Sequence, residues 1–248
     1  MTERIQVPLY SLADCCKQFA QITGGQIIKH EDYETIIVPG NFFYTKHFIY
    51  HATEENLDSI MKEIFQGAPL AISYTAERVP ARIADILTDH GYINPINQIG
   101  MIYDIPADYS YQPDEKVQIV EPSRYLEYSD TITNGFGKPR DDQYCEYMTR
   151  YENAHCYAYI ENNKIMGTAT GLKGSDFPGV HEVAVLPDAR NHGACTHMLQ
   201  RLIGDLKEEG YKQLSLQASA MGQPVYAALG FEAVSHIPTW LPAGPGPV

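Results

Sequence analysis

One segment constrains the fold of this chain more than any other: an apolar strand that runs into a proline and is followed at once by an amphipathic helix. The strand is expected over residues 180–186, where the run Val180-His-Glu-Val-Ala-Val-Leu186 is stopped by Pro187-Asp188. The helix is expected to begin around Asn191. One face of it is predicted to be buried, because apolar side chains recur at helical spacing at Cys195, Met198, Leu199, Leu202 and Leu206.

The turn between this strand and this helix predicts an anion site. Backbone N–H groups in the first turn of a helix have no intrahelical partners, and the helix dipole adds a partial positive charge there. Gly193 has no side chain to obstruct the approach, so a phosphate or pyrophosphate can reach these donors. The patterns G-x-x-x-x-G-K-[ST] and G-x-G-x-x-G do not occur in the sequence, which argues against a nucleoside triphosphate or dinucleotide site.

The rest of the C-terminal half predicts an α/β fold with a mixed, mostly antiparallel sheet. Asn162-Asn163 tolerates positive φ and predicts a tight hairpin between two strands. Helices are expected after Pro122, from Asp141 and over residues 223–229. Strands are expected at 117–121, 156–160, 165–170, 213–217 and 231–240.

Composition excludes several classes of function. The chain has 248 residues, enough for one or two domains, and its formal charge of -13 repels nucleic-acid backbones and anionic lipids. The five cysteines are odd in number and form no C-x-x-C pair, which favours a reducing cytoplasm. There is no apolar run of membrane-spanning length and no signal-peptide core. We therefore expect a cytoplasmic protein without nucleic-acid or membrane partners, and leave open whether it forms an oligomer.

Residues 105–116 divide the chain, because this stretch contains two prolines and shows neither helical nor strand periodicity. The sequence thus predicts two domains, 1–113 and 114–248. In the first, Thr53 is expected to cap a helix, and the helix-glycine-strand plan of residues 86–103 echoes that of residues 228–240. Either the chain contains a weak internal repeat, or these are two common connections. If the repeat is real, the first domain is degenerate and helps to wall the substrate pocket of the second.

The segment Arg190-x-x-Gly193-x-Cys195, after a strand ending Val185-Leu-Pro187, resembles the acetyl-CoA loop [Q/R]-x-x-G-x-[G/A] of the GCN5-related N-acetyltransferase (GNAT) family. Cys195 departs from that pattern, since the family has glycine or alanine there. The segment Tyr226-Ala-Ala-Leu-Gly230-Phe231 is similar to the family's Y-x-x-L-G-F. The resemblance covers residues 117–240 in family order, and it implies a GNAT fold with a smaller, partial GNAT-like N-terminal lobe.

The resemblance also implies a reaction and a cofactor site. It implies transfer of an acetyl group from acetyl-CoA to a primary amine by direct attack in a ternary complex, without a metal. The pantetheine arm is expected along one strand and the pyrophosphate at the following turn. The residues expected to bind the cofactor are Val183, Ala184, Val185, Arg190, Asn191, His192, Gly193, Ala194, Cys195, Thr196 and Ser219.

Three residues are candidates for proton transfer. The resemblance makes Tyr226 the general acid, because a phenol with a pKa near 10 can protonate the departing thiolate. His181 or Glu182 is the candidate base, and water remains an alternative. Strand alternation predicts that His181 shares a face with Val183 and Val185, and that Glu182 faces the other way unless a bulge redirects it. Each of the three also has an ordinary structural interpretation.

Other site types receive less support. Cys195 is expected to pack in the core, since helical cysteines on an apolar stripe are usually buried. His192 and His197 do not share a helix face, so no metal site is expected. The negative charge favours a small cationic amine as the acceptor. A protein amine as acceptor, or a non-catalytic CoA-binding regulatory or scaffolding module, are the alternatives.

Overall fold

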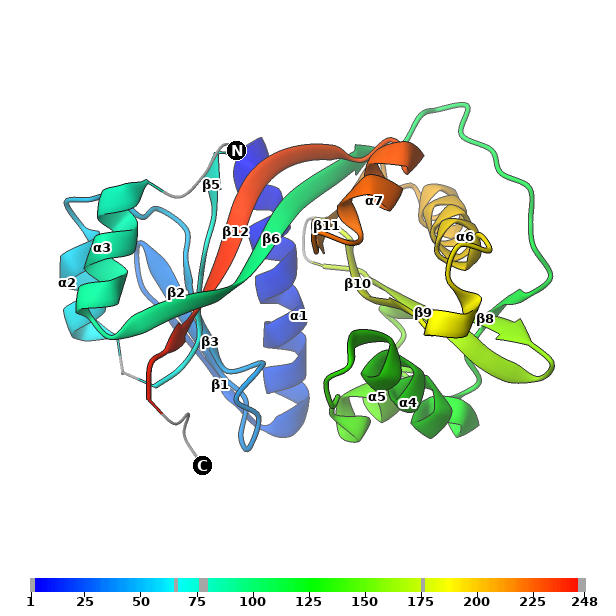
Figure 1. Cartoon of the computed structure of the whole chain (residues 1–248), viewed down its shortest axis with the longest axis horizontal. Coiled ribbons are helices and arrows are strands. Elements are labelled where there is room, and N and C mark those ends of the chain that lie inside the picture. The colour runs from blue at the N-terminus through cyan, green and yellow to red at the C-terminus, as the bar shows by residue number, and fades with distance from the viewer. Residues whose placement is uncertain (1–2, 65–66, 76–79, 175–176, 245–248) are drawn as a thin grey trace. The chain divides into compact units, whose positions relative to one another are not determined.

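The computed structural model describes residues 3–64, 67–75, 80–174 and 177–244. The chain forms two compact units (Figure 1). The first comprises Met1–Ile102, Leu216–Ala227 and Phe231–Val248, and the second comprises Tyr103–Ser215 and Ala228–Gly230. These units do not coincide with the boundary predicted at 113/114. The physical reason is that the last strand pairs with strands of the N-terminal half, so the end of the chain belongs to the first unit.

The first unit contains a mixed sheet flanked by helices, among them most of α7 (Gln223–Leu229). Its strand order is β1-β2-β3-β4-β12-β6, and β5 also pairs with β12. The strands β1, β2 and β3 are antiparallel, whereas β4 is parallel to β3 because α2 connects them. The other helices are α1 (Val7–Thr23), α2 (Leu57–Glu63) and α3 (Ala81–Asp89). The strands are β1 (Gln26–Lys29), β2 (Tyr33–Ile37), β3 (Lys46–Ile49), β4 (Leu70–Ile72), β5 (Tyr74–Thr75), β6 (Tyr92–Asp104) and β12 (Glu232–Pro242).

The start of α2 shows why this unit folds as the sequence predicts. Thr53 and Asn56 exchange hydrogen bonds: the Thr53 N–H donates to Asn56 Oδ1, and the Asn56 N–H donates to Thr53 Oγ1. The helix therefore begins at Leu57, one turn after the predicted cap. Leu57, Ile60 and Met61 point into a core shared with α3 and the strands, which Trp240 of β12 completes.

The second unit is a sheet in the order β7-β8-β9-β10-β11, with helices on both faces. Figure 1 shows α6 above these strands and α4 and α5 below them. The strands are β7 (Val117–Ile119), β8 (Ala154–Glu161), β9 (Lys164–Leu172), β10 (Gly179–Val185) and β11 (Gln213–Ala218). The helices are α4 (Tyr125–Phe136), α5 (Asp142–Met148) and α6 (Ala194–Glu208), and α7 (Gln223–Leu229) ends in this unit.

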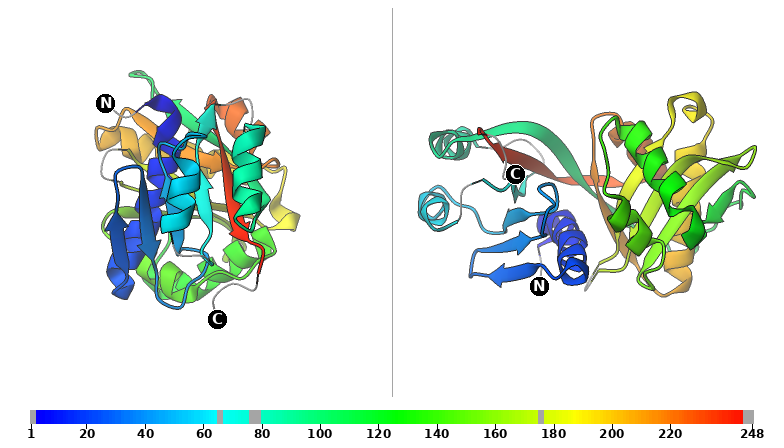
Figure 2. Two further views of the ribbon diagram at one scale, coloured as in Figure 1. Left: turned by 90° about the vertical axis from the view of Figure 1, so that its left-hand side faces the viewer. Right: turned by 90° about the horizontal axis from the view of Figure 1, so that it is seen from below.

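Alternation along β9 assigns these helices to opposite faces. A Cβ on Gly171 would meet the Leu202 side chain of α6 at 3.0 Å. The next residue back, Thr170, faces α4, since its Oγ1 lies 2.7 Å from the Tyr128 hydroxyl oxygen. The right-hand view of Figure 2 shows α4, in green, lying across the strands. The α4 face of β9 thus carries the Thr170 hydroxyl, and Gly171 on the opposite face packs tightly against α6.

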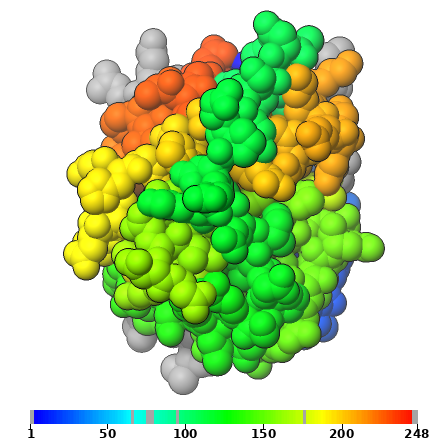
Figure 3. Space-filling model, turned by 90° about the vertical axis from the view of Figure 1, so that its right-hand side faces the viewer, coloured from blue at the N-terminus to red at the C-terminus, as the bar shows by residue number. Residues whose placement is uncertain are grey.

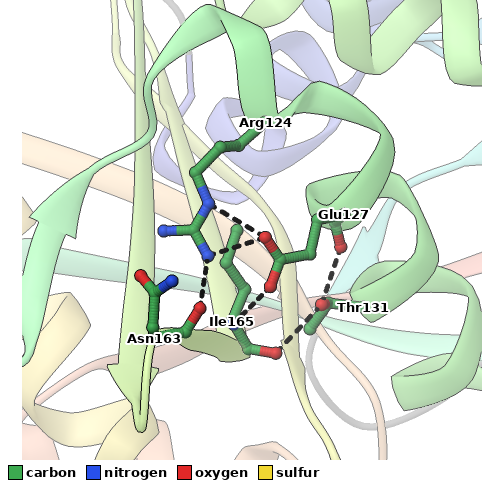
Figure 4. A network of polar contacts seen from close by, with 5 residues as sticks. All are labelled: Arg124, Glu127, Thr131, Asn163 and Ile165. Atoms are coloured by element: carbon green, nitrogen blue, oxygen red, sulfur yellow. Dashed lines mark hydrogen bonds and ion pairs between the residues drawn. The ribbon is translucent and has the colours of Figure 1, made fainter.

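The β8–β9 hairpin forms where the sequence predicts it. Asn162 and Asn163 have φ of 50° and 62°, as a tight two-residue turn requires. A polar network joins this hairpin to the start of α4 (Figure 4). Glu127 accepts two hydrogen bonds from Arg124, at 2.9 and 2.6 Å, and one from the Ile165 N–H at 2.8 Å. These contacts fix α4 on the sheet.

Residues 105–116 have no helix or strand, as predicted, but they are not a free linker. They lie along α6: the Tyr109 hydroxyl donates to the Gln200 carbonyl oxygen at 3.0 Å, and the Tyr111 ring covers Gly204. Figure 3 shows this segment, in green, crossing the surface beside yellow and orange parts of the chain. The segment thus belongs to the second unit. Within the described residues, no helix has the length and apolar character to cross a membrane.

Candidate functional site

A bulge interrupts β10 at the centre of the second unit. His181 pairs with Thr170 of β9, and Ala184 pairs with Thr168. Two residues of β10, Glu182 and Val183, therefore lie opposite a single residue of β9. A bulge leaves one residue out of the ladder and resets the alternation of side chains.

The bulge overturns one expectation about His181. Directly opposed residues share a face, so His181 lies with Thr170 on the α4 face. Val185 pairs with Gly167, which faces Met198 of α6. His181 and Val185 therefore face opposite ways. The prediction that they share a face was wrong, because strand alternation assumed a regular ladder.

His181 is buried, and its Nε2 has no hydrogen-bond partner among the described residues. Burial lowers the pKa of this imidazole to about 4, because desolvation disfavours the charged form. The ring is therefore neutral at neutral pH, and burial opposes its protonation. A buried nitrogen without a partner is rare in folded proteins and marks a position that calls for a functional explanation.

Glu182 lies in the bulge and is redirected toward the α4 side. Its φ is +49°, and its carboxylate forms an ion pair with Arg140, with Oε2 3.0 Å from Nε. Its carbonyl oxygen accepts a hydrogen bond from the Thr168 hydroxyl at 2.8 Å. The sequence singled out Glu182 but gave no signal for Arg140, which lies 42 residues earlier in the chain.

The expected pantetheine strand follows the bulge, over Val183, Ala184 and Val185. Ala184 is buried against α4, where a Cβ on Gly135 would meet the Ala184 Cβ at 2.8 Å. Val183 and Val185 are partly exposed. A short 3-10 turn, Pro187–Ala189, ends the strand as the proline predicts.

Arg190 points back to the strand. Its Nε donates to the Val185 carbonyl oxygen and its Nη2 to the Gly135 carbonyl oxygen, both at 3.1 Å. Two of its three nitrogens are thereby engaged by backbone. In this structure Arg190 holds the strand and α4 together, and its expected contact with pyrophosphate stays a prediction.

The turn before α6 has the shape that the sequence predicts. Gly193 is the N-cap of α6, with φ of +83° and no side chain that could cap the helix. Ala194, Cys195 and Thr196 form the first turn, whose N–H groups lack intrahelical partners. Asn191 also has positive φ, at 64°, and Asn191 and His192 are exposed. The turn thus offers several backbone donors to an anion.

Two further residues border this turn. A Cβ on Gly193 would meet the His197 ring at 3.2 Å, and His197 Nδ1 lies 2.6 Å from Asp114 Oδ2. Burial alone would raise the pKa of Asp114, but hydrogen bonds from the Lys116 N–H and from His197 outweigh it and lower that pKa. The sequence weighed His197 only as a metal ligand and missed this pairing, because Asp114 lies 83 residues away.

Neither a thiolate nor a metal ion has support at the site. Burial raises the pKa of Cys195 to about 12, so its thiol stays protonated at neutral pH and is a poor nucleophile. Among the residues that the structure describes, no three His, Cys, Asp or Glu side chains are grouped so as to hold a metal ion.

Tyr226 and Ser219 belong to the first unit. Tyr226 is buried in α7, and its ring lies 5.9 Å from that of Phe231, centroid to centroid. Ser219 is exposed, and its Oγ accepts a hydrogen bond from the Gly222 N–H at 3.2 Å, just before α7. Their expected roles stay predictions, which rest on the sequence motif.

Comparison with known proteins identifies this architecture. The family model "Acetyltransferase (GNAT) family" matches residues 122–231. A GCN5-related N-acetyltransferase from Kribbella flavida is similar in fold, with a TM-score of 0.64 and 11% identity over 95% of this chain and 96% of that one. A GCN5-related N-acetyltransferase from Sphaerobacter thermophilus has a TM-score of 0.58 and 14% identity, over 98% of this chain and 94% of that one.

A conserved protein of unknown function from Staphylococcus epidermidis is also similar, with a TM-score of 0.63 and 14% identity, over 92% of this chain and 98% of that one. No curated protein sequence matches this chain. At these identities the likeness to solved structures shows the fold alone. It extends over nearly the whole chain, so the N-terminal half is part of the shared architecture.

Proposed function

Since residues 122–231 form a domain of the acetyltransferase (GNAT) family, we propose that this acetyl-CoA-dependent enzyme acetylates the primary amine of a small cationic molecule. The acetyl donor follows from the family. The acceptor and the roles of individual residues are our proposal.

The observation that carries the proposal is the turn before α6. Gly193 has the positive φ that this turn needs and presents the N–H groups of Ala194, Cys195 and Thr196 without a side chain in front of them. The pyrophosphate of acetyl-CoA carries the charge that these donors and the helix dipole favour. Cys195 replaces a smaller residue of the family pattern, but its side chain packs in the unit and its N–H is unchanged.

The bulged strand supports the same proposal. The pantetheine arm contains amides that need hydrogen-bond partners, and a bulge takes part of β10 out of its ladder with β9. Residues 183–185 connect the bulge to the turn before α6. One extended ligand can therefore follow the strand and end with its pyrophosphate at Gly193.

The proposed reaction is a single displacement. The neutral amine attacks the thioester carbon and forms a tetrahedral intermediate. Its collapse breaks the carbon–sulfur bond, expels the CoA thiolate with the electron pair of that bond and leaves the acetyl group bonded to nitrogen. His181 is the proposed proton acceptor on geometry, because its buried Nε2 has no partner among the described residues. Burial, which lowers the pKa of the ring to about 4, makes it a weak base. Tyr226 is the proposed donor to the CoA thiolate, by its place in the Y-x-x-L-G-F motif.

A cationic acceptor is supported by charge. The formal charge of -13 raises the local concentration of cations around the protein and attracts polyamines, aminoglycosides and basic amino-acid derivatives. A positioned base contributes about 10²- to 10⁴-fold to such a transfer.

The test is release of free thiol from acetyl-CoA in the presence of a panel of small amines, basic peptides and a no-amine blank. Thiol release with one or more small cationic amines, and a matching acetyl mass shift on that amine, supports the proposal. Acetylation of the basic peptides alone would show that the acceptor is a protein amine and not a small molecule. Thiol release at the blank rate with every amine, despite tight acetyl-CoA binding, would indicate a non-catalytic CoA-binding module.

A further inference from the structure

We propose that the ion pair between Arg140 and Glu182 is a latch that holds β10 in its bulged conformation, and that both residues position the strand on which acetyl-CoA rests. The inference depends on the proposed function, since it concerns the strand that binds the cofactor. It gives Glu182 a role in conformation and leaves proton transfer to another group.

The backbone at Glu182 is in a conformation that glutamate rarely adopts. Four non-glycine residues of the described chain have positive φ, and the other three are asparagines, which tolerate this region because a short polar side chain can bond locally. Glu182 lacks that ability, yet its φ is +49°. Strain of this kind persists only where the surrounding structure holds it.

Contacts on both its backbone and its side chain hold the strained residue. The Thr168 hydroxyl donates to the Glu182 carbonyl oxygen at 2.8 Å, and the Arg140 guanidinium binds the carboxylate at 3.0 Å. The side chains of Arg140 and Glu182 are only 14% and 8% exposed, so solvent screens this pair far less than a surface ion pair. Removal of either partner would leave the other side chain buried without its ion-pair partner.

Arg140 is itself fixed to the end of α4. Its N–H donates to Thr133 Oγ1 at 3.0 Å, and its guanidinium lies 4.9 Å from the centre of the Phe136 ring. The end of α4 touches β10 directly, where Gly135 lies against Ala184. The latch therefore joins the bulge to a rigid helix.

Arg190 holds the same helix to the other end of the strand. It bridges the Gly135 and Val185 carbonyl oxygens, so residues 183–185 are bracketed by Arg140 on one side and Arg190 on the other. The Glu182 carboxylate is bound to the Arg140 guanidinium in this arrangement, with Oε2 3.0 Å from Nε, which suits it to hold the strand in place.

The expected effect on acetyl-CoA binding follows from the fraction of molecules in which β10 has the bulge. If acetyl-CoA binds only the bulged strand, its dissociation constant rises in inverse proportion to the fraction of molecules with that bulge. Glu182→Ala removes the latch and keeps the strain, so the dissociation constant should rise about tenfold. Glu182→Gly also removes the latch but adopts positive φ freely, so it should bind acetyl-CoA within about threefold of wild type.

Substitutions of Arg140 provide a second test of the ion pair. Arg140→Leu should weaken acetyl-CoA binding about tenfold, and Arg140→Lys should recover part of that loss because it restores the charge. If Arg140→Leu is poorly folded, the double variant Arg140→Leu/Glu182→Gly carries neither buried charge nor strain and should bind nearly as wild type. Arg150→Leu, at the exposed Arg150–Glu146 pair, is the matched control and should leave binding unchanged.

Isothermal titration with acetyl-CoA and steady-state kinetics on each variant decide the matter. A fall of about a hundredfold in kcat in both Glu182→Gly and Glu182→Ala, with unchanged binding, would make Glu182 the base and overturn the inference. Equal affinity in wild type, Glu182→Ala and Arg140→Leu would also overturn it and leave the proposed function intact. Failure of the wild-type protein to bind acetyl-CoA would refute both this inference and the proposed function.

Discussion

Both halves of the chain contain a strand that leads through a helix to a neighbouring strand, but they differ at the turn before that helix. In the first half, β3 leads through α2 to β4, its parallel neighbour. In the second, β10 leads through α6 to β11, its neighbour in the sheet. A helix, a glycine of positive φ (Gly91 or Gly230) and a long strand come next, after the short strand β5 in the first half and directly in the second. The internal repeat stays a prediction, with two common helix-glycine-strand connections as the alternative.

The turns themselves have opposite chemistry. Before α6 stands Gly193, without a side chain, at the start of a helix of 15 residues. Before α2 stand the exposed carboxylates of Glu54 and Glu55, between Thr53 and Asn56, which bond to each other. The helix that follows has 7 residues. Arg82 pairs with Glu54 at 3.3 Å, but the Glu55 carboxylate still disfavours a pyrophosphate in front of this short helix. The turn before α2 therefore lacks the open glycine N-cap that is proposed to hold the cofactor before α6.

The proposed catalytic positions differ in the same way. Tyr226 lies four residues before Gly230, whereas the residue four before Gly91 is the buried Leu87, which has no proton to give. His181 has an unpartnered Nε2, whereas His47 in β3 lies with Nδ1 2.8 Å from the Thr35 hydroxyl oxygen. The side chains at the proposed catalytic positions thus have no counterparts of the same chemistry at these places in the first half, and function resides in particular side chains and not in the fold.

The largest effect is expected at the glycine that distinguishes the two turns. Gly193→Val places a branched side chain at φ +83° against the His197 ring and in front of the helix donors. Losing two hydrogen bonds to a charged ligand should weaken acetyl-CoA binding by at least about a hundredfold. Thermal-shift titration measures this.

The matched control is Gly91→Val, in the first half. Gly91 also has positive φ, at 79°, and a Cβ there would meet nothing within 4 Å. It should cost stability through the backbone alone and leave the acetyl-CoA shift in place. A Gly193→Val protein that is stabilised by acetyl-CoA as strongly as wild type would show that this turn is not the cofactor site.

The next effect is expected at Tyr226. Tyr226→Phe keeps the aromatic ring against Phe231 and removes only the hydroxyl. The variant then resembles the first half at this position, where Leu87 has no hydroxyl. Loss of acid catalysis should lower kcat by about a hundredfold with acetyl-CoA affinity unchanged. Tyr92→Phe is the control, since it removes a buried hydroxyl bonded to the Ala68 carbonyl oxygen at 3.2 Å and should leave kcat unchanged. Near wild-type kcat in Tyr226→Phe would mean that solvent protonates the thiolate.

The third effect is the pH dependence of stability at His181. An imidazole with an unfolded pKa of about 6.5 and a folded pKa of about 4 binds its proton more tightly in the unfolded state. Stability is therefore full above pH 6.5 and is lost as the pH falls toward 4, by at most about 3 kcal/mol. His181→Leu should remove that loss, which urea unfolding across this pH range measures.

His47 sharpens the comparison. His47→Leu leaves the buried Thr35 hydroxyl without that partner, so it should cost about 1–3 kcal/mol at pH 7 and keep the acid sensitivity that His181 causes. His181→Leu breaks no hydrogen bond of the described structure, so its cost at pH 7 should be smaller. Equal acid sensitivity in wild type and His181→Leu would show that this imidazole does not titrate as its burial implies.

Local patterns predicted most of the second unit because they act over a few residues. The double asparagine fixed the hairpin turn, Pro187 stopped β10, and the apolar stripe with Gly193 defined α6. The same reasoning located the turn that carries the proposed cofactor site. Its success reflects backbone sterics and helix periodicity, both of which can be read from neighbouring residues.

Contacts between distant residues could not be predicted in this way. Nothing in the local sequence pairs Arg140 with Glu182 or Asp114 with His197, because each pairing depends on how helices and strands pack. The bulge in β10 has no periodic signature either, and it reversed the expected face of His181 relative to Val185. The pairing of β12 with the N-terminal strands likewise moved the domain boundary away from residues 113/114.

The smallest effect is expected where the first half lacks a site. We expect one acetyl-CoA per chain by isothermal titration, because only the turn before α6 combines a glycine N-cap with a long helix among the described elements. Glu54→Gln/Glu55→Gln removes the repelling charges but not the Thr53 and Asn56 side chains that occupy the turn before α2. Stability should change by less than about 0.5 kcal/mol, as for exposed positions, and the stoichiometry should stay at one. Binding of a second acetyl-CoA molecule by the double variant would show that the two carboxylates alone prevented binding at the turn before α2. The backbone and side-chain geometry of that turn would then not exclude the cofactor.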